Sequence, residues 1–307
     1  MLVFLTPIRH PDSSTNYQRV KTLFEMSLRS MCSQTDSDFR LIVICNVRPQ
    51  LEYDDPRVIY HIVNFAAPSR ERRPVGSDPL SSHPARTDKG TKLLTGMLLA
   101  RRFNPTHFAF VDADDLVSNR VAAFANAQPS HPGWYVDAGY VANYETMRIQ
   151  RRHSLVRYCG STLTPNASAL YELSNAARSL DETSEQGKLL AGVSRSFFKH
   201  VLSDHTYTVQ YLANHGLVMR PIPFRAVAWV QQNGENYSGV RGTISGIPAT
   251  PSFCQEFGLA ALPANGRSAK VSDHLREMLI STGSRLGSLR SRLGGFPSVP
   301  RTTLSNR

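Results

Sequence analysis

The chain has 307 residues, of which 41% are hydrophobic and 9% aromatic, and it carries a net charge of +11. This length and composition suit one large α/β domain with additions and an ordinary globular core. The four cysteines are widely separated without a C-x-x-C pair, which excludes a zinc ribbon and a disulfide scaffold and suits a reducing compartment. No stretch approaches the ~18 apolar residues of a membrane span, and the opening MLVFLTP is typical of a first strand rather than a signal peptide. We therefore expect a cytoplasmic protein.

Strands and helices are expected to alternate over the first part of the chain. Apolar periodicity predicts a strand over 2–6, a helix over 17–34, strands over 39–46 and 58–63, a helix over 86–102 and a strand over 108–111. A stretch over 66–85, rich in proline and serine, is expected to form a long loop. This alternation predicts a mostly parallel central sheet that is flanked by helices and joined by right-handed crossovers.

The second half of the chain is expected to extend this sheet. The predicted elements are a strand over 134–144, a small-residue turn at Cys159-Gly-Ser-Thr162, a helix over 204–214 capped by Ser203 or Asp204 and ended by Gly216, a strand over 221–231 and a turn-rich loop over 234–239. The predicted folded domain spans 1–263. Residues 264–307 are expected to be a tail rich in glycine, serine and arginine.

The strand over 108–111 is followed by three carboxylates, Asp112, Asp114 and Asp115. Its apolar run predicts burial on both faces, so the carboxylates lie at the carboxyl end of a central strand, where open α/β sheets bind ligands. Close carboxylates repel one another unless a cation lies between them. Because Mg²⁺ is bound by one or two carboxylates together with substrate phosphates, the sequence predicts a metal–diphosphate site here.

Two other interpretations compete with this metal site. In the first, Asp115 is the cap of a helix over 117–126. The second is a haloacid-type phosphatase, which also carries Asp-x-Asp after a strand. Such enzymes place the motif near the start of the domain and have Thr or Val two residues after the second Asp, where this chain has Leu116.

The order of these parts resembles the GT-A fold of nucleotide-sugar-dependent glycosyltransferases, and more closely a bacterial group of family-2-like glycosyltransferases. The resemblance covers roughly residues 1–239. It rests on FVDADD after a helix that carries RTDKGTK, followed in order by GWYVDAGYV, CGST, DH at the start of a late helix, and NGENYSG. It implies a Rossmann-like α/β fold of GT-A type and the transfer of a sugar from a nucleoside-diphosphate sugar to a glycan or lipid-linked acceptor.

The resemblance implies a donor site assembled from several strand ends. Mn²⁺ or Mg²⁺ would be held by Asp112 and Asp114, with Asp115 replacing or assisting Asp114, and would bridge the donor phosphates. Many relatives have an acid near Asn46 that reads the base. A plainer interpretation of the Asp88–Lys92 pair is a solvated helix start worth only ~0.3 kcal/mol. The implied donor-binding residues are Thr6, Arg9, Asn46, Arg86, Asp88, Lys89, Lys92 and Asp112.

Asp204 and His205 occupy the position where inverting members carry an acidic base, which takes the proton of the acceptor hydroxyl. His205 would serve as that base or as a metal ligand, and helix capping is the alternative for Asp204. Tyr135 and Trp229 are expected in the core. The residues implied on the acceptor side are Trp134, Asp137, Gly160, Ser161, Glu235 and Asn236.

The tail over 264–307 carries eight Lys/Arg against two Asp/Glu, with leucines at near-helical spacing. A basic amphipathic segment of this kind contacts the anionic inner face of a membrane, and a disordered solubilising tail is the alternative. Elsewhere we find no face of basic residues interleaved with aromatics, so we expect no nucleic-acid partner.

Together these features predict a metal-dependent glycosyltransferase of polysaccharide synthesis. A nucleotidyltransferase of similar fold is one alternative, although residues 6–14 contain no glycine for the phosphate loop that such enzymes carry. A catalytically idle binding protein of GT-A type is another. It stays open because Asn46 and Tyr237, the latter at a position where relatives often have His, depart from the family pattern.

Overall fold

The computed structural model describes residues 1–69, 83–236 and 244–259. Most of the loop expected over 66–85, the last part of the loop over 234–239 and the whole tail over 264–307 lie outside these ranges. Among the helices that are described, none has the length and apolarity to cross a bilayer.

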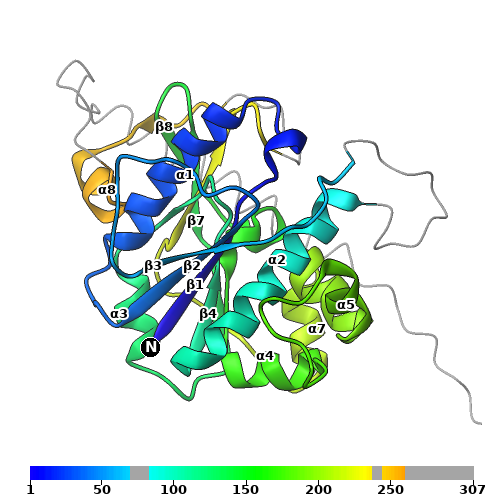
Figure 1. Ribbon diagram of the computed structural model, residues 1–307. Coiled ribbons are helices and arrows are strands. Elements are labelled where there is room, and N and C mark those ends of the chain that lie inside the picture. The colour runs from blue at the N-terminus through cyan, green and yellow to red at the C-terminus, as the bar shows by residue number, and fades with distance from the viewer. Residues whose placement is uncertain (70–82, 237–243, 260–307) are drawn as a thin grey trace, which may run out of the picture.

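Within the described ranges, the main sheet has seven strands in the order β10-β6-β9-β4-β1-β2-β3 (Figure 1). All of them run in one direction except β9, which is antiparallel to both β4 and β6. The predicted α/β class, with a mostly parallel central sheet flanked by helices, is confirmed. The strand bounds are β1 Leu2–Pro7, β2 Phe39–Cys45, β3 Val58–Ile62, β4 His107–Phe110, β6 Gly133–Tyr135, β9 Leu163–Pro165 and β10 Arg220–Pro221.

Helices cover both faces of this sheet, because successive residues of a strand point to opposite sides. Val3 and Leu5 of β1 pack in one apolar cluster with α2 (Pro84–Ala100), whereas Leu2 and Phe4 pack in another with α1 (Tyr17–Cys32). The cluster on the α1 side also contains residues of α3 (Val121–Asn126). The cluster on the α2 side contains residues of α4 (Ala167–Ser174), α5 (Gln186–Ala191), α6 (Arg195–Phe197) and α7 (Thr208–Asn214).

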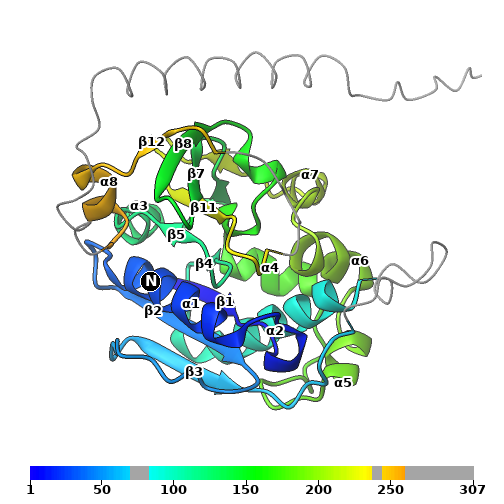
Figure 2. The same ribbon diagram turned by 90° about the horizontal axis from the view of Figure 1, so that it is seen from above.

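A second sheet lies beside the main one (Figure 2). In the described ranges it has five strands in the order β12-β8-β7-β11-β5, and Phe253 of α8 (Pro251–Glu256) packs in its apolar cluster. Its strands are β5 Leu116–Val117, β7 Gly139–Asn143, β8 Arg148–Arg152, β11 Val227–Gln231 and β12 Ile247–Pro248.

The single strands predicted over 134–144 and 221–231 are wrong, because each region forms two strands that belong to different sheets. β6 and β10 lie in the main sheet, whereas β7 and β11 lie in the second. Gly139 permits the close approach of β7 to β11, since a Cβ added there would lie 2.7 Å from the carbonyl oxygen of Val227. Apolar side chains continue across the break, so the sequence pattern does not reveal it.

Two predicted helix starts are also wrong. Asp115 caps no helix, because Leu116–Val117 forms β5 and α3 begins only at Val121. Neither Ser203 nor Asp204 caps α7, which begins at Thr208 after a π-helical turn over Phe198–Ser203. The predicted end of α7 is confirmed, with Gly216 at positive φ. Short 3-10 helices are η1 Pro11–Ser13, η2 Arg101–Phe103, η3 Leu155–Arg157 and η4 Gly160–Thr162.

Candidate active site

A cavity of about 670 Å³ opens at the carboxyl edge of the main sheet, where residues after β1 and β4 meet β11 of the second sheet. Its volume is typical of ligand-binding pockets. The predicted site residues that line it are Arg9, Arg86, Asp88, Lys89, Asp112, Asp114, Asp115, Gly160, Asp204, His205, Glu235 and Asn236. The structure therefore brings together residues that are far apart in the sequence.

Asp115 is fully engaged with the scaffold. Its carboxylate accepts hydrogen bonds from the Ser161 hydroxyl, the Cys159 thiol at 3.2 Å and the backbone N–H of Val230 at 2.9 Å. Burial, together with the charges of Asp114 and Asp112, raises the pKa of Asp115 well above its usual range. Since both of its oxygens are occupied, we leave Asp115 out of the metal-binding set proposed below and assign Ser161 to the same scaffold.

Asp114 faces the cavity with one oxygen held and one open. Its Oδ2 accepts hydrogen bonds from the side-chain amides of Asn233 at 2.8 Å and Asn236 at 3.3 Å. Its Oδ1 has no hydrogen bond to any described residue. Burial and the neighbouring Asp112 raise the pKa of Asp114 to about 6. A cation between the two carboxylates would relieve this repulsion.

Asp112 forms an ion pair with Lys89 of α2, and each side chain is about 30% exposed (31% for Asp112 and 30% for Lys89). Burial alone would lower the pKa of Lys89, but the Asp112 charge outweighs it and raises that pKa. Gly160 lies against this pair, because a Cβ added there would be 2.6 Å from Lys89 Nζ and 2.8 Å from Asp112 Oδ2. The small residue in the CGST turn therefore makes room for the ion pair.

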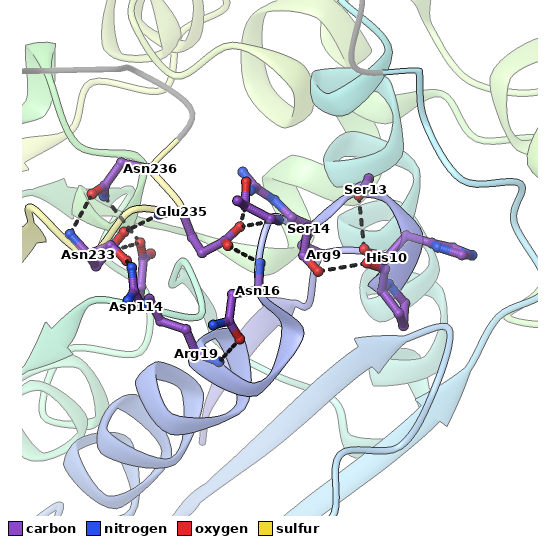
Figure 3. A network of polar contacts seen from close by, with 12 residues as sticks. Arg9, His10, Ser13, Ser14, Asn16, Arg19, Asp114, Asn233, Glu235 and Asn236 are labelled. Carbon is purple, nitrogen blue, oxygen red and sulfur yellow. Dashed lines mark hydrogen bonds and ion pairs between the residues drawn. The ribbon is translucent and has the colours of Figure 1, made fainter.

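The segment 233–236 follows β11 and contacts Asp114 and Arg9 (Figure 3). Glu235 is 7% exposed, and its carboxylate pairs with Arg9 at 2.8 Å and accepts the backbone N–H groups of Thr15 at 3.1 Å and Asn16 at 2.6 Å. Its backbone N–H donates to the Asn233 side-chain oxygen at 2.8 Å. Glu235 and Asn236, predicted on the acceptor side, thus hold Arg9 and Asp114 in place.

The Asp88–Lys92 pair is buried, so its interpretation as a solvated pair is wrong. Lys92 has no exposed surface and donates to Asp88 Oδ2 and to the Ile8 carbonyl oxygen, both at 2.8 Å. Lys92 cannot reach a diphosphate in the cavity, which corrects its predicted role. The Oδ1 atom of Asp88, beside the cavity, is buried without a hydrogen-bond partner among the described residues.

Asp204 and His205 lie together on the cavity wall just before α7. Asp204 pairs with Arg86 and accepts the Thr206 N–H at 3.0 Å. Burial opposes ionisation of Asp204, but these donors prevail and lower its pKa. Burial, followed by the nearby Lys89 charge, lowers the pKa of His205 to about 4. His205 is therefore neutral at pH 7, and its buried Nε2 has no hydrogen-bond partner in the part of the chain that the structure describes.

Besides Lys92 and Ser161, four predicted site residues do not line the cavity. The Thr6 hydroxyl is buried against Met31 Sδ at 3.4 Å, and the Asn46 amide donates to the carbonyl oxygens of Val63 and Phe65. Trp134 is buried in the core, with its ring stacked on His131 at 4.3 Å. The fourth residue is Asp137, which follows β6. Contact of Thr6 and Trp134 with a ligand is thereby contradicted, because both are enclosed by protein.

Sequence reasoning missed three residues of the cavity region. Trp229, expected in the core, lines the cavity beside Tyr158, and Asn233 holds Asp114. Tyr158 directly precedes the CGST turn and Asn233 is the first residue of NGENYSG, so both lie beside motifs that the sequence had already assigned to the site. The turn that aims each side chain could not be inferred from a linear pattern.

Among the described residues, no group of three or more His, Cys, Asp or Glu side chains is arranged to hold a metal ion by itself. Asp112 and the open oxygen of Asp114 nevertheless face one cavity that His205 also lines. Two carboxylates, completed by phosphate oxygens and water, match the way that Mg²⁺ is usually bound. The donor set therefore fits a metal that arrives with a phosphorylated ligand.

Comparisons with known proteins give only remote likenesses. The sequence matches no family model and no curated protein. A crystal structure of S. aureus TarS, a glycosyltransferase, is similar with a TM-score of 0.40 and 9% identity over 75% of this chain and 36% of that one. A TarS 1-349 structure gives a TM-score of 0.36 and 9% identity over 75% and 60%. This chain thus spans less than two thirds of either TarS chain, and likeness at these values carries no argument about activity.

Replacing Lys92 with methionine should destabilise the protein by roughly 3–5 kcal/mol, because it leaves the buried Asp88 carboxylate unpaired. The matched control is Arg29→Met in the Glu25–Arg29 pair, which has the same i,i+4 spacing but side chains that are 21% (Glu25) and 43% (Arg29) exposed. That change should cost less than about 0.5 kcal/mol. Urea unfolding gives both free energies, and equal small losses would contradict the burial of the Asp88–Lys92 pair.

The lowered pKa of His205 predicts a pH dependence of stability in metal-free buffer. The unfolded chain protonates His205 at a pKa of about 6.5, whereas the folded chain does so at about 4. At His205 the unfolded state therefore binds more protons between these values, so the contribution of His205 to the free energy of unfolding should fall, by at most about 3 kcal/mol, as the pH falls through this window. Asp114 and Asp115, whose pKa values are raised, contribute with the opposite sign. Relative to the wild type, His205→Gln should remove the His205 contribution from the pH slope measured by urea unfolding with EDTA, and the exposed His215→Gln should not. An unchanged slope in His205→Gln would refute the assignment.

Proposed function

We propose that this protein is a metal-dependent glycosyltransferase, which moves a sugar from a nucleoside-diphosphate sugar to a saccharide or lipid-linked acceptor. The observation that carries this proposal is the meeting of two cavity-facing carboxylates, Asp112 and Asp114, with the cations Arg9, Arg86 and Lys89 in one cavity. Carboxylates that share a site with several cations suit a ligand that brings both a metal and phosphate groups. The GT-A resemblance of the sequence supports the same class.

Asp112 and Asp114 would hold Mn²⁺ or Mg²⁺ together with the donor phosphates. Bound there, the metal would stabilise the charge that builds on the leaving nucleoside diphosphate. Lys89 and Arg9 would bind phosphate oxygens directly. Both cations are paired with carboxylates in the ligand-free fold, Lys89 with Asp112 and Arg9 with Glu235, so binding exchanges one anionic partner for another.

His205 is the residue that we propose as the base. The Nε2 atom of its neutral imidazole has no partner among the described residues, and it would take the proton of the acceptor hydroxyl. The acceptor oxygen would bond to the anomeric carbon as the bond from that carbon to the diphosphate breaks, and the proton would rest on His205. Asp204, held by Arg86 and Thr206, positions the turn that carries His205.

The idle binding protein remains the second candidate, and one observation favours it. In this structure Lys89 neutralises Asp112, and the Asn233 and Asn236 amides bind Asp114, so the scaffold partners both carboxylates without a metal. The two candidates differ in their response to a nucleotide supplied with Mn²⁺.

The proposed function predicts that one nucleoside diphosphate raises the melting temperature of the protein only when Mn²⁺ is present. A ligand at a hundredfold excess over its Kd stabilises the folded state by about 2.7 kcal/mol, which a thermal scan detects easily. Asp114→Ala should abolish this shift and leave the ligand-free protein folded, because the Asp114 side chain lines the cavity. A panel of UDP, GDP, dTDP, ADP and CDP, each with MnCl2 or EDTA, provides the measurement.

The matched control is Asp54→Ala, which removes an exposed carboxylate that does not line the cavity and should keep the full shift. A full shift in Asp114→Ala would sink the metal assignment. The absence of any shift in the wild-type protein would favour the idle alternative.

A further inference from the structure

Two aromatic side chains form part of the cavity wall on the side of the second sheet. Trp229 belongs to β11, and Tyr158 follows η3 directly. Their ring centroids are 6.3 Å apart and their planes differ by 18°. At this spacing, nearly parallel rings are offset from one another.

Core packing and a neighbouring cation hold this aromatic pair in place. Trp229 packs against the apolar cluster that contains Leu155 and Cys159, which anchors it to the core. The Arg152 guanidinium of β8 lies 4.6 Å from the centre of the Tyr158 ring. A cation over an aromatic ring is attracted to its face, so Arg152 restrains Tyr158. Tyr158 nevertheless remains 45% exposed, which is a large fraction for an aromatic side chain on a cavity wall.

The pair is also tied to the carboxylate segment 112–115. Tyr158 stands two residues before Gly160, which lies against the Lys89–Asp112 ion pair. Trp229 stands directly before Val230, whose N–H donates to Asp115 at 2.9 Å. A molecule on the aromatic pair would therefore lie in the same cavity as the proposed leaving phosphate, and the two rings are fixed relative to it.

The remaining groups of the cavity indicate which part of the reaction would use this wall. Arg9 after β1, and Arg86 and Lys89 of α2, supply positive charge on the side of the main sheet. A diphosphate belongs with those cations. The aromatic wall offers flat apolar faces, which suit the apolar face of a sugar ring.

We propose that Tyr158 and Trp229 form the acceptor subsite and bind a saccharide by stacking against its sugar rings. The role of this subsite as the acceptor site rests on the proposed function. Its binding of a saccharide rests on the aromatic pair alone. It replaces Trp134, which is buried, with an aromatic pair that faces the cavity.

The chain offers a specific probe, because it contains two tryptophans, Trp134 in the core and Trp229 in the cavity. Fluorine NMR of the full-length protein labelled with 5-fluorotryptophan should give one resonance for each, assigned with Trp229→Phe. The protein is titrated with di- and trisaccharides of glucose and of N-acetylglucosamine, and separately with uridine. No metal or nucleotide is added.

We expect a saccharide to move the Trp229 resonance and leave that of Trp134 unchanged. Tyr158→Ala should weaken this binding about fivefold, which corresponds to the loss of about 1 kcal/mol from one aromatic contact. Tyr207→Ala is the matched control, because Tyr207 is 65% exposed and does not line the cavity, and it should bind as the wild type does.

Three results would overturn the inference: a shift with uridine but with none of the saccharides, no shift of Trp229 with any probe, or unchanged saccharide affinity in Tyr158→Ala. Because the titration omits Mn²⁺ and nucleotide, its outcome is independent of the proposed function. If the protein binds a saccharide but responds to no nucleotide, the saccharide subsite is supported and the proposed glycosyltransferase activity is rejected.

Discussion

The buried carboxylate of Asp115 is the constraint on which the site depends. It joins three elements that are distant in the sequence: the end of β4, the η4 turn through Ser161 and Cys159, and β11 through Val230. A buried carboxylate without such partners would be costly, so the fold has to supply all of them together. Once Asp115 is fixed, Asp112 and Asp114 are directed away from the core and into the cavity.

The charges that surround this cavity balance one another before any ligand binds. Arg9 pairs with Glu235, Arg86 with Asp204, and Lys89 with Asp112, and the three cationic side chains are 28%, 38% and 30% exposed. Partly exposed ion pairs contribute little net stability, on the order of 1 kcal/mol or less. A diphosphate with its cation can therefore replace these partners at small cost. The buried Asp88–Lys92 pair is different, because it has no exposed cation to offer and serves the fold.

Much of the architecture follows from the sequence, because strands buried on both faces leave continuous apolar runs such as Phe108–Val111. That run also located the carboxylates at the sheet edge. The burial of individual polar side chains was harder to infer. Lys92 lies on the buried face of α2, although a lysine in a helix is ordinarily expected to face solvent. The sequence also did not reveal that the chain leaves the main sheet after β6 and enters the second sheet at β7. That change depends on the close approach of Gly139 to β11, a contact between residues about ninety positions apart. The position of Trp229 on the cavity wall could not be inferred either, because it depends on the place of β11 in the second sheet.

The most direct test of the account is anomalous diffraction from crystals of the protein grown with MnCl2 and the nucleoside diphosphate that stabilises it most. The account predicts a manganese peak bound by Asp112 and Asp114, with the diphosphate between that peak and the side chains of Arg9 and Lys89. A nucleotide bound elsewhere, or a nucleotide in the cavity with no manganese beside these two carboxylates, would contradict it.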